Sequence, residues 1–168
     1  HFGKDKTFVV GNIGNPYTLE ADKTSKDSVT VGEISSFQLE TIHTFHPVVS
    51  AILNITPDHL NRHHTMEAYV AAKEAVASQQ TKADICVLNY DNDYTRDFAG
   101  RCPATPVLFS SHQELENGYF LRGDKIIKSV NGEEHELMDI HKDMNLVGLC
   151  NVENVMAAVA ISYFMGAG

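Results

Sequence analysis

The chain has 168 residues, and 43% of them are hydrophobic, which is enough to fill the core of one globular domain. Its 22 acidic residues outnumber 13 basic residues and give a formal net charge of -9, so no basic field is available to gather the phosphates of a nucleic acid. Nucleic acid is therefore excluded as a partner. A nucleotide is not, because one Mg²⁺ and a few backbone amides can hold phosphates in an acidic protein.

Cysteine spacing and hydropathy indicate a cytoplasmic protein with no membrane partner. Cys86, Cys102 and Cys150 are widely spaced and form no CxxC pair, which argues against a disulfide framework and against a cysteine-based zinc site. Free thiols are typical of a reducing compartment. The first residues, HFGKDKTFVV, contain no long apolar run, and no stretch reaches the ~18 apolar residues that a membrane span requires.

Five short runs rich in β-branched and apolar residues predict parallel strands buried on both faces. Helical patterns alternate with them: one over 65–80, with Thr65 as its N-cap, and one after Asn151 that ends near Gly166. This alternation predicts an α/β fold with a mostly parallel, doubly wound sheet flanked by helices. The predicted strands are TFVV (7–10), SVTVGEI (28–34), VVSAILNI (48–55), ADICVLNY (83–90) and PVLFS (106–110).

The stretch 118–139 has a different pattern, with RGDK and NGEE separating short alternating segments. Such spacing is typical of small antiparallel hairpins. We expect an antiparallel insertion at the sheet edge, within one domain that spans 1–168.

Polar side chains follow two of the predicted strands. Glu33 ends the second strand, and His59 follows the third in TPDHLNRHH. Ligands of doubly wound sheets collect at the carboxyl ends of strands, so the two residues would face one crevice if their strands are neighbours. Two alternatives stay open: a solvent-facing carboxylate for Glu33, and a helix-start role beside Asp58 for His59.

Lys73 lies on the apolar face of the 65–80 helix, in register with Met66, Tyr69 and Val70. One interpretation is snorkelling, in which the four-carbon stem follows the core edge and the ammonium reaches water. A partly buried amine would instead lose its proton more readily. A neutral amine can take up CO₂ as a carbamate, which is an anionic metal ligand.

The turn GNIGNP (11–16) could bring backbone close to a ligand, although an ordinary strand-to-helix connection is the more common explanation of such a turn. A P-loop, GxxxxGK[ST], is absent from all 168 residues, so ATP phosphates are not held by that route.

Histidine and aspartate clusters offer weaker possibilities. His59 and His63, at i and i+4, could bind Zn²⁺ in a non-catalytic histidine-based metal-binding module, but no Glu lies between them as in HExxH. Asp91 and Asp93 in NYDND could hold a cation or a ribose hydroxyl, or simply form an Asx turn.

Five segments, taken together and in this order, resemble the central domain of the UDP-N-acetylmuramoyl-L-alanine:D-glutamate ligase family, the MurD family of Mur ligases. SSFQLET is specific to that family, whereas DHLxRH and the AAK lysine also occur in its sisters. The alternative within enzymes is therefore a sister Mur ligase or a folylpolyglutamate synthase-like ligase that adds another amino acid. The five segments are GNIGNP, EISSFQLET, ILNITPDHLNRH, AYVAAKEAV and LNYDND.

The resemblance implies an ATP-dependent, Mg²⁺-dependent ligase of peptidoglycan synthesis, and so a role in cell wall biogenesis, cell shape and cell division. Its substrates are UDP-N-acetylmuramoyl-L-alanine and D-glutamate, joined through an acyl phosphate. The full-length enzyme would be a monomer with a UDP-binding domain, a P-loop and a C-terminal domain outside these residues. We expect this chain to be a central-domain fragment that is inactive alone and self-associates through an open sheet edge.

Matching by position, the resemblance implies three catalytic residues that also bind metal. Glu33 and His59 correspond to Mg²⁺ ligands, and Lys73 corresponds to a carbamylated lysine that supports a metal.

Four asparagine and serine positions correspond to ligand contacts. Asn12 and Ser35 would contact the UDP-linked substrate, and Asn151 and Asn154 would lie near the adenine of ATP. Cys150 stands where relatives usually carry His, so the adenine side departs from the family pattern.

Overall fold

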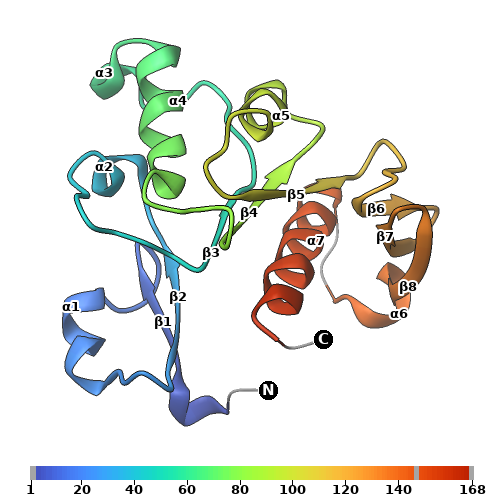
Figure 1. The fold of residues 1–168 in the computed structure, drawn as a ribbon, viewed down its shortest axis with the longest axis horizontal. Helices are drawn as coiled ribbons and strands as arrows, with labels where there is room; N and C mark the ends of the chain where they lie inside the picture. The colour runs from blue at the N-terminus through green and yellow to red at the C-terminus, as the bar shows by residue number, and fades with distance from the viewer. Residues whose placement is uncertain (1–2, 146–147, 167–168) are drawn as a thin grey trace. The chain divides into compact units, whose positions relative to one another are not determined.

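The computed structural model of the protein describes residues 3–145 and 148–166. The chain divides into two compact units, His1–His43 and Thr44–Gly168. Each unit carries its own β-sheet, of two strands in the first and six in the second (Figure 1).

The first unit is built around two parallel strands, β1 (Thr7–Gly11) and β2 (Val29–Glu33). Their register pairs Gly11 with Glu33, so the GNIGNP turn and the carboxyl end of β2 share one end of this sheet. The helices of this unit are the 3-10 helix η1 (Lys4–Lys6), α1 (Tyr17–Glu20), the 3-10 helix η2 (Ala21–Lys23) and α2 (Ser36–Leu39).

The predicted strands of this unit are confirmed in position but not in burial. Val10 is the one buried residue of β1, and no residue of β2 is buried. The interpretation of 28–34 as a strand buried on both faces, ending at Glu33, was therefore wrong. β-branched residues fit any pleated surface, so a run of them does not distinguish a buried strand from an exposed one.

The strands before Glu33 and His59 are not members of one sheet. β2 belongs to the two-stranded sheet, whereas β3 (Val49–Ile52) begins the six-stranded sheet. A strand pattern in the sequence gives the existence of a strand and not its place in a sheet.

The second unit contains a sheet in the order β3-β4-β5-β6-β7-β8. The pairs from β3 to β6 are parallel, and the pairs from β6 to β8 are antiparallel. The antiparallel strands predicted for 118–139 are thus confirmed, and they lie at one edge of the sheet. The strands after β3 are β4 (Ile85–Asn89), β5 (Thr105–Ser110), β6 (Gly118–Arg122), β7 (Lys125–Val130) and β8 (Glu133–Asp139).

Helices cover both faces of the parallel strands, as in a doubly wound sheet (Figure 1). α4 (Met66–Glu74) and α5 (Asp93–Ala99) pack on one face, and α7 (Leu149–Phe164) packs on the other. β4 supplies both cores, because Cys86 and Leu88 point to the first and Val87 to the second. The predicted α/β fold with a mostly parallel sheet is confirmed. The remaining short helices are α3 (Leu60–His63), the 3-10 helix η3 (Ala75–Ala77) and α6 (Ile140–Asp143).

The predicted helix ends are mostly confirmed. The Thr65 hydroxyl caps α4 by accepting from the Ala68 N–H at 3.2 Å. Beyond Glu74 the predicted helix continues only as the 3-10 helix η3. α7 begins at Leu149, earlier than predicted, and Gly166 follows its end with a left-handed φ of 86°.

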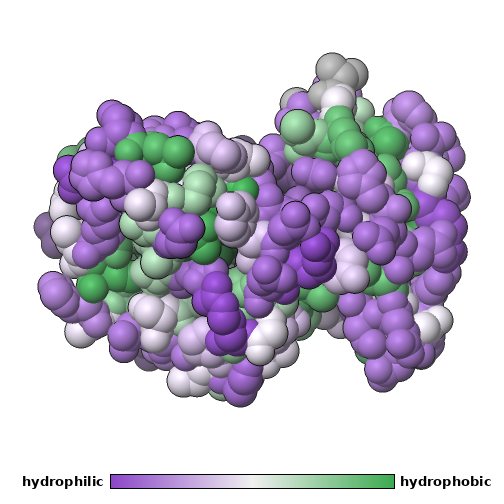
Figure 2. Space-filling model, turned by 90° about the horizontal axis from the view of Figure 1, so that it is seen from above, coloured by the Kyte–Doolittle hydropathy of each residue, from purple (hydrophilic) through white to green (hydrophobic). Residues whose placement is uncertain are grey.

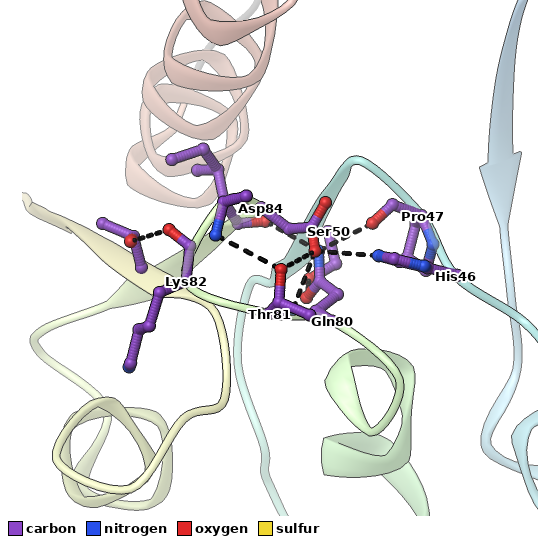
Figure 3. Close-up of polar contacts among 10 residues, drawn as sticks. His46, Pro47, Ser50, Gln80, Thr81, Lys82 and Asp84 are labelled. Carbon is purple, nitrogen blue, oxygen red and sulfur yellow. Dashed lines mark hydrogen bonds and ion pairs between the residues drawn. The ribbon is translucent and has the colours of Figure 1, made fainter.

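Buried polar groups tie β3 to β4 at their amino ends (Figure 3). Gln80 is 4% exposed, and its Oε1 accepts from the Ser50 hydroxyl at 2.7 Å. Its Nε2 donates to the Pro47 and Ile85 carbonyl oxygens at 2.9 and 3.0 Å. All the polar atoms of this buried amide therefore have partners, as stability in a low-dielectric interior requires.

The face drawn in Figure 2 is mainly hydrophilic, with hydrophobic residues in scattered groups. Within the described residues, no helix has the length and apolar character needed to cross a membrane.

Candidate functional site

Two of the predicted site residues, Asn12 and Glu33, are bonded to each other at the end of the two-stranded sheet. Asn12 Nδ2 donates to Glu33 Oε1 at 3.0 Å, and the Asn12 backbone N–H donates to the Glu33 carbonyl oxygen at 2.7 Å. Both residues are exposed. Asn12 therefore orients the Glu33 carboxylate while leaving it open to solvent and to a ligand.

Glycine at position 11 makes this arrangement possible. Gly11 has a φ of +111°, and a Cβ placed there would lie 2.1 Å from the Glu33 carbonyl oxygen. Any side chain at this position would push β2 away from the turn. The glycine of GNIGNP thus has a local packing role, independent of any ligand.

Ser35 begins α2 through a reciprocal capping box with Gln38. The Gln38 N–H donates to Ser35 Oγ at 3.3 Å, and the Ser35 N–H donates to Gln38 Oε1 at 2.8 Å. The SSFQ portion of SSFQLET is therefore explained in part by helix capping. This cap also fixes the chain direction two residues after Glu33.

His59 stands at the N-cap position of α3 but does not cap the helix with its side chain. Its backbone is left-handed, with a φ of 53°, a conformation that is costly for a residue with a side chain. Asp58 supports it, because Oδ1 accepts from the His59 N–H at 2.7 Å and Oδ2 lies 3.4 Å from His59 Nε2. The imidazole is thereby aimed by its own backbone and by Asp58.

The structure brings His59 and Lys73 to the same aromatic ring. Lys73 is half-buried, and its Nζ lies 5.3 Å from the centre of the Tyr69 ring. The His59 ring meets Tyr69 edge-on, at 6.4 Å between centroids and an interplanar angle of 81°. Tyr69 itself is only 4% exposed. Two residues predicted from separate segments therefore share one neighbour, which the sequence pattern did not single out.

His63, the other half of the possible zinc pair, also packs against Tyr69. It is 6% exposed, and its ring lies 5.2 Å from that of Tyr69, tilted by 42°. In the part of the chain that the structure describes, no third His, Cys, Asp or Glu joins His59 and His63 in a metal-type group. A structural zinc site requires four ligands, so this pair does not support a zinc-binding module.

A second polar group lies at the carboxyl ends of β4 and β5 and involves Asp91. One ligand atom each from Asp91, His112 and Glu153 lies within 4.8 Å of the others. The Ser111 N–H donates to Asp91 Oδ2 at 2.7 Å, and the Ser111 hydroxyl donates to Glu153 Oε1 at 2.7 Å. These bonds connect the end of β5 with β4 and α7, which is a structural role.

Sequence reasoning singled out Asp91 but missed His112 and Glu153, since neither lies in a recognisable motif. The rule that polar residues collect at strand ends was the one available signal. Asp93, predicted together with Asp91, is instead paired with Arg96 on α5.

Asn151 and Asn154 lie three residues apart near the start of α7, so they project from neighbouring positions of one helix face. Asn151 is half-buried, whereas Asn154 and Cys150 are exposed. The helix that carries them begins after Gly148, whose carbonyl oxygen accepts from the Asn151 N–H at 3.0 Å.

Glu33 and Asn12 thus belong to the first unit, and His59, Lys73 and the α7 asparagines belong to the second. The expected convergence of Glu33 with His59 and Lys73 stays a prediction.

Residues 4–162 match the family described as the Mur ligase middle domain. The chain belongs to this family.

Curated relatives of this middle domain carry one common name. The chain is 56% identical over 162 residues to the UDP-N-acetylmuramoylalanine--D-glutamate ligase of Lachnospira eligens, covering 96% of this chain and 36% of the relative. It is 58% identical over 155 residues to the enzyme of that name in Lachnoclostridium phytofermentans, covering 92% of this chain and 34% of the relative. It is 47% identical over 161 residues to the enzyme of that name in Clostridioides difficile, covering 95% of this chain and 35% of the relative. The chain spans about a third of the length of these relatives.

Solved Mur ligase structures share the fold. The MurF ligase of Thermotoga maritima in complex with ADP matches with a TM-score of 0.63 at 15% identity, over 97% of this chain and 40% of that one. The UDP-N-acetylmuramate:L-alanyl-gamma-D-glutamyl-meso-diaminopimelate ligase of Neisseria meningitides matches with a TM-score of 0.59 at 13% identity, over 96% and 62%. At such identities the likeness concerns the fold alone.

The donor chemistry of this Mur ligase middle domain is compatible with a hard divalent cation. Glu33 offers an exposed carboxylate oxygen, and a carbamate on Lys73 would offer further anionic oxygens. His59 would add a single nitrogen, which Mg²⁺ accepts less readily than oxygen and Mn²⁺ accepts more readily. Each of these donor types, taken by itself, is one that Mg²⁺ or its usual probe Mn²⁺ accepts.

Proposed function

We propose that this chain is the central part of an ATP-dependent ligase that joins D-glutamate to UDP-N-acetylmuramoyl-L-alanine in peptidoglycan synthesis, and so contributes to cell wall biogenesis, cell shape and cell division. The observation that carries the proposal is the 56% identity, over 96% of the chain, to a UDP-N-acetylmuramoylalanine--D-glutamate ligase. The three free cysteines fit a cytoplasmic enzyme.

In this proposal Glu33 and His59 hold Mg²⁺. Bound Mg²⁺ would neutralise the repelling oxygens of ATP and of the substrate carboxylate during phosphoryl transfer. Asn12 keeps the Glu33 carboxylate in one orientation through its 3.0 Å bond, and Asp58 does the same for the His59 backbone. Both supports reduce the reorganisation needed when a cation binds.

Lys73 becomes a metal ligand through a carbamate. The lone pair of its neutral amine attacks the carbon of dissolved CO₂ and forms a C–N bond. One C=O π bond breaks and its electron pair moves to oxygen, and one amine proton passes to water. The product is an N-carboxylate that carries one negative charge. Half-burial of Lys73 on α4 is compatible with this role, because the new anion keeps part of its contact with water and would be paired with a bound cation.

The remaining predicted residues position substrates. Asn12 and Ser35 lie at the end of the two-stranded sheet and would contact the UDP-linked substrate, with Ser35 also capping α2. Asn151 and Asn154, on one face of α7, would contact adenine. We further propose that the full-length enzyme is a monomer and that this chain alone does not complete the reaction.

The test is phosphate release by the complete gene product, supplied with ATP, Mg²⁺, UDP-N-acetylmuramoyl-L-alanine and one candidate amino acid or dipeptide at a time. We expect turnover with D-glutamate and none with L-lysine, D-alanyl-D-alanine or diaminopimelate. Glu33→Gln and Lys73→Ala should each lower kcat by about a hundredfold or more. A preference for another amino acid would overturn the substrate assignment, and family-like turnover by residues 1–168 alone would overturn the incompleteness.

A further inference from the structure

Tyr69 lies at the centre of the cluster that contains two of the three proposed metal-site residues. Its ring is 4% exposed and belongs to the core formed with Ile52, Ile55 and Phe98. The ring is therefore held by the packed interior of the second unit, and it cannot move without disturbing that core. A rigid ring in contact with two polar side chains can set the distance between them.

Lys73 reaches this ring from the same helix. Tyr69 and Lys73 are four residues apart on α4, so their side chains lie on one helical face. Nζ lies 5.3 Å from the ring centre, within the range of a cation–π contact. The end of the Lys73 side chain therefore lies over the tyrosine ring, which restricts the directions that its end group can take.

His59 reaches the ring from a different segment, the loop between β3 and α3. Its imidazole stands edge-on at 6.4 Å, an arrangement that aromatic pairs prefer. His63, at 5.2 Å, supports the tyrosine from α3. The tyrosine thus links the loop that carries His59 to the helix that carries Lys73.

The ring also discriminates between the two forms of Lys73. The face of an aromatic ring is negative, so it attracts an ammonium and repels a carbamate. Once the carbamate has formed, this repulsion directs its oxygens away from Tyr69. A ring at this position therefore favours a carbamate that points outward from the core.

We propose that Tyr69 is a positioning residue for the metal site, which sets the spacing between the His59 imidazole and the Lys73 carbamate. This inference rests on the proposed function, because it requires that both residues serve the metal. Tyr69 does not touch the metal or the substrate in this proposal. The positioning role requires the aromatic ring of Tyr69 and does not require its hydroxyl.

The experiment compares Tyr69→Leu and Tyr69→Phe with the wild type in the complete gene product. Mn²⁺ affinity is measured by electron paramagnetic resonance, and the carbamate is measured by ¹³C NMR in ¹³C-bicarbonate. Tyr69→Phe should behave like the wild type in both. Tyr69→Leu should weaken Mn²⁺ binding about tenfold, as loss of a supporting residue does elsewhere, and reduce the carbamate signal. Tyr69→Met is measured alongside, since its flexible side chain fills irregular core space if Leu prevents folding.

Phe98→Leu is the matched control, because Phe98 belongs to the same core and is 3% exposed. If Phe98→Leu reduces both signals as much as Tyr69→Leu, core loosening explains the effect and the proposal is overturned. Wild-type behaviour of Tyr69→Leu, together with loss of both signals in His59→Ala and Lys73→Ala, overturns the role of Tyr69 alone. Retention of both signals in His59→Ala and Lys73→Ala, or their absence from the wild type, overturns the proposed metal site on which this inference rests, whereas turnover with D-glutamate tests the proposed function separately.

Discussion

Asn12 holds Glu33 at two points, with its side chain on the carboxylate at 3.0 Å and its backbone N–H on the carbonyl oxygen at 2.7 Å. The first bond sets the direction of the acid, and the second fixes where β2 ends. Both depend on the turn after β1, where Gly11 pairs with Glu33. The proposed substrate contact and the proposed metal ligand of this unit are therefore parts of one hydrogen-bonded element.

Gly11→Ala should disrupt this element. The new Cβ would lie 2.1 Å from the Glu33 carbonyl oxygen at a φ of +111°, so the turn must separate from β2. We expect a loss of about 2 kcal/mol or more in the stability of the first unit. Hydrogen exchange of the β1 and β2 amides measures this loss locally.

Gly14→Ala is the control for that change. Gly14 also has a positive φ, of +78°, but the nearest atom to its new Cβ is the Val9 carbonyl oxygen at 3.4 Å. It should cost only the conformational strain, about 1 kcal/mol. Equal exchange rates in the two variants would show that overlap with Glu33 is unimportant.

Gln80→Leu should destabilise the second unit, although leucine is similar in size to glutamine. The change leaves the Ser50 hydroxyl and the Pro47 and Ile85 carbonyl oxygens without their buried partner (Figure 3). We expect a loss of about 3 kcal/mol in the free energy of unfolding, measured with urea.

The exposed neighbour Gln79 provides the matched control, since Gln79→Leu removes an amide from the surface and should leave stability nearly unchanged. Adding Ser50→Ala to Gln80→Leu should recover about 1 kcal/mol, because the orphaned hydroxyl is then gone. A double variant less stable than Gln80→Leu alone would contradict the bonding scheme.

The sequence predicted the local features and the fold class, but not which strands are covered by other elements. The strand positions, the Thr65 cap and the hairpins of 118–139 follow from residue preferences and turn chemistry, which are local. The exposure of β2 depends on which surfaces meet, and short apolar runs do not record this.

The same distinction applies to the site. Glu33, His59 and Lys73 could be named because they occur in segments that resemble a known family. Tyr69 reads as an ordinary core position in the pattern of α4, and its contacts with His59 come from a separate loop. Only coordinates reveal such a neighbour.

Asp84 should make the second unit sensitive to acid. Its pKa is held below the ordinary value first by the hydrogen bond to His46, at 2.8 Å, and then by the Thr81 backbone N–H, at 2.7 Å. A carboxylate with a lowered folded-state pKa contributes stability above its unfolded-state pKa, and loses that contribution as pH falls through the folded-state value. Stability should therefore decline as the pH is lowered below about 4.

The measurement is the urea midpoint between pH 2 and pH 6 for the wild type and for Asp84→Asn. The variant should be less stable at pH 6 and should show a flatter acid dependence. Asp97→Asn, on the exposed face of α5, should retain the wild-type dependence. An unchanged acid profile in Asp84→Asn would assign the acid sensitivity to other carboxylates.

Self-association through a sheet edge is the last prediction. Within the described residues, β3 pairs only with β4 and so ends the six-stranded sheet, and Val48 just before it is 62% exposed. An unpaired edge with an apolar flank is a template for a second chain. We expect light scattering of residues 1–168 to show a mass that rises with concentration, and Val48→Lys to reduce the rise, because edge lysines oppose pairing. A constant monomer mass would refute the prediction. Equal association by Val48→Lys would show that the contact lies on another surface.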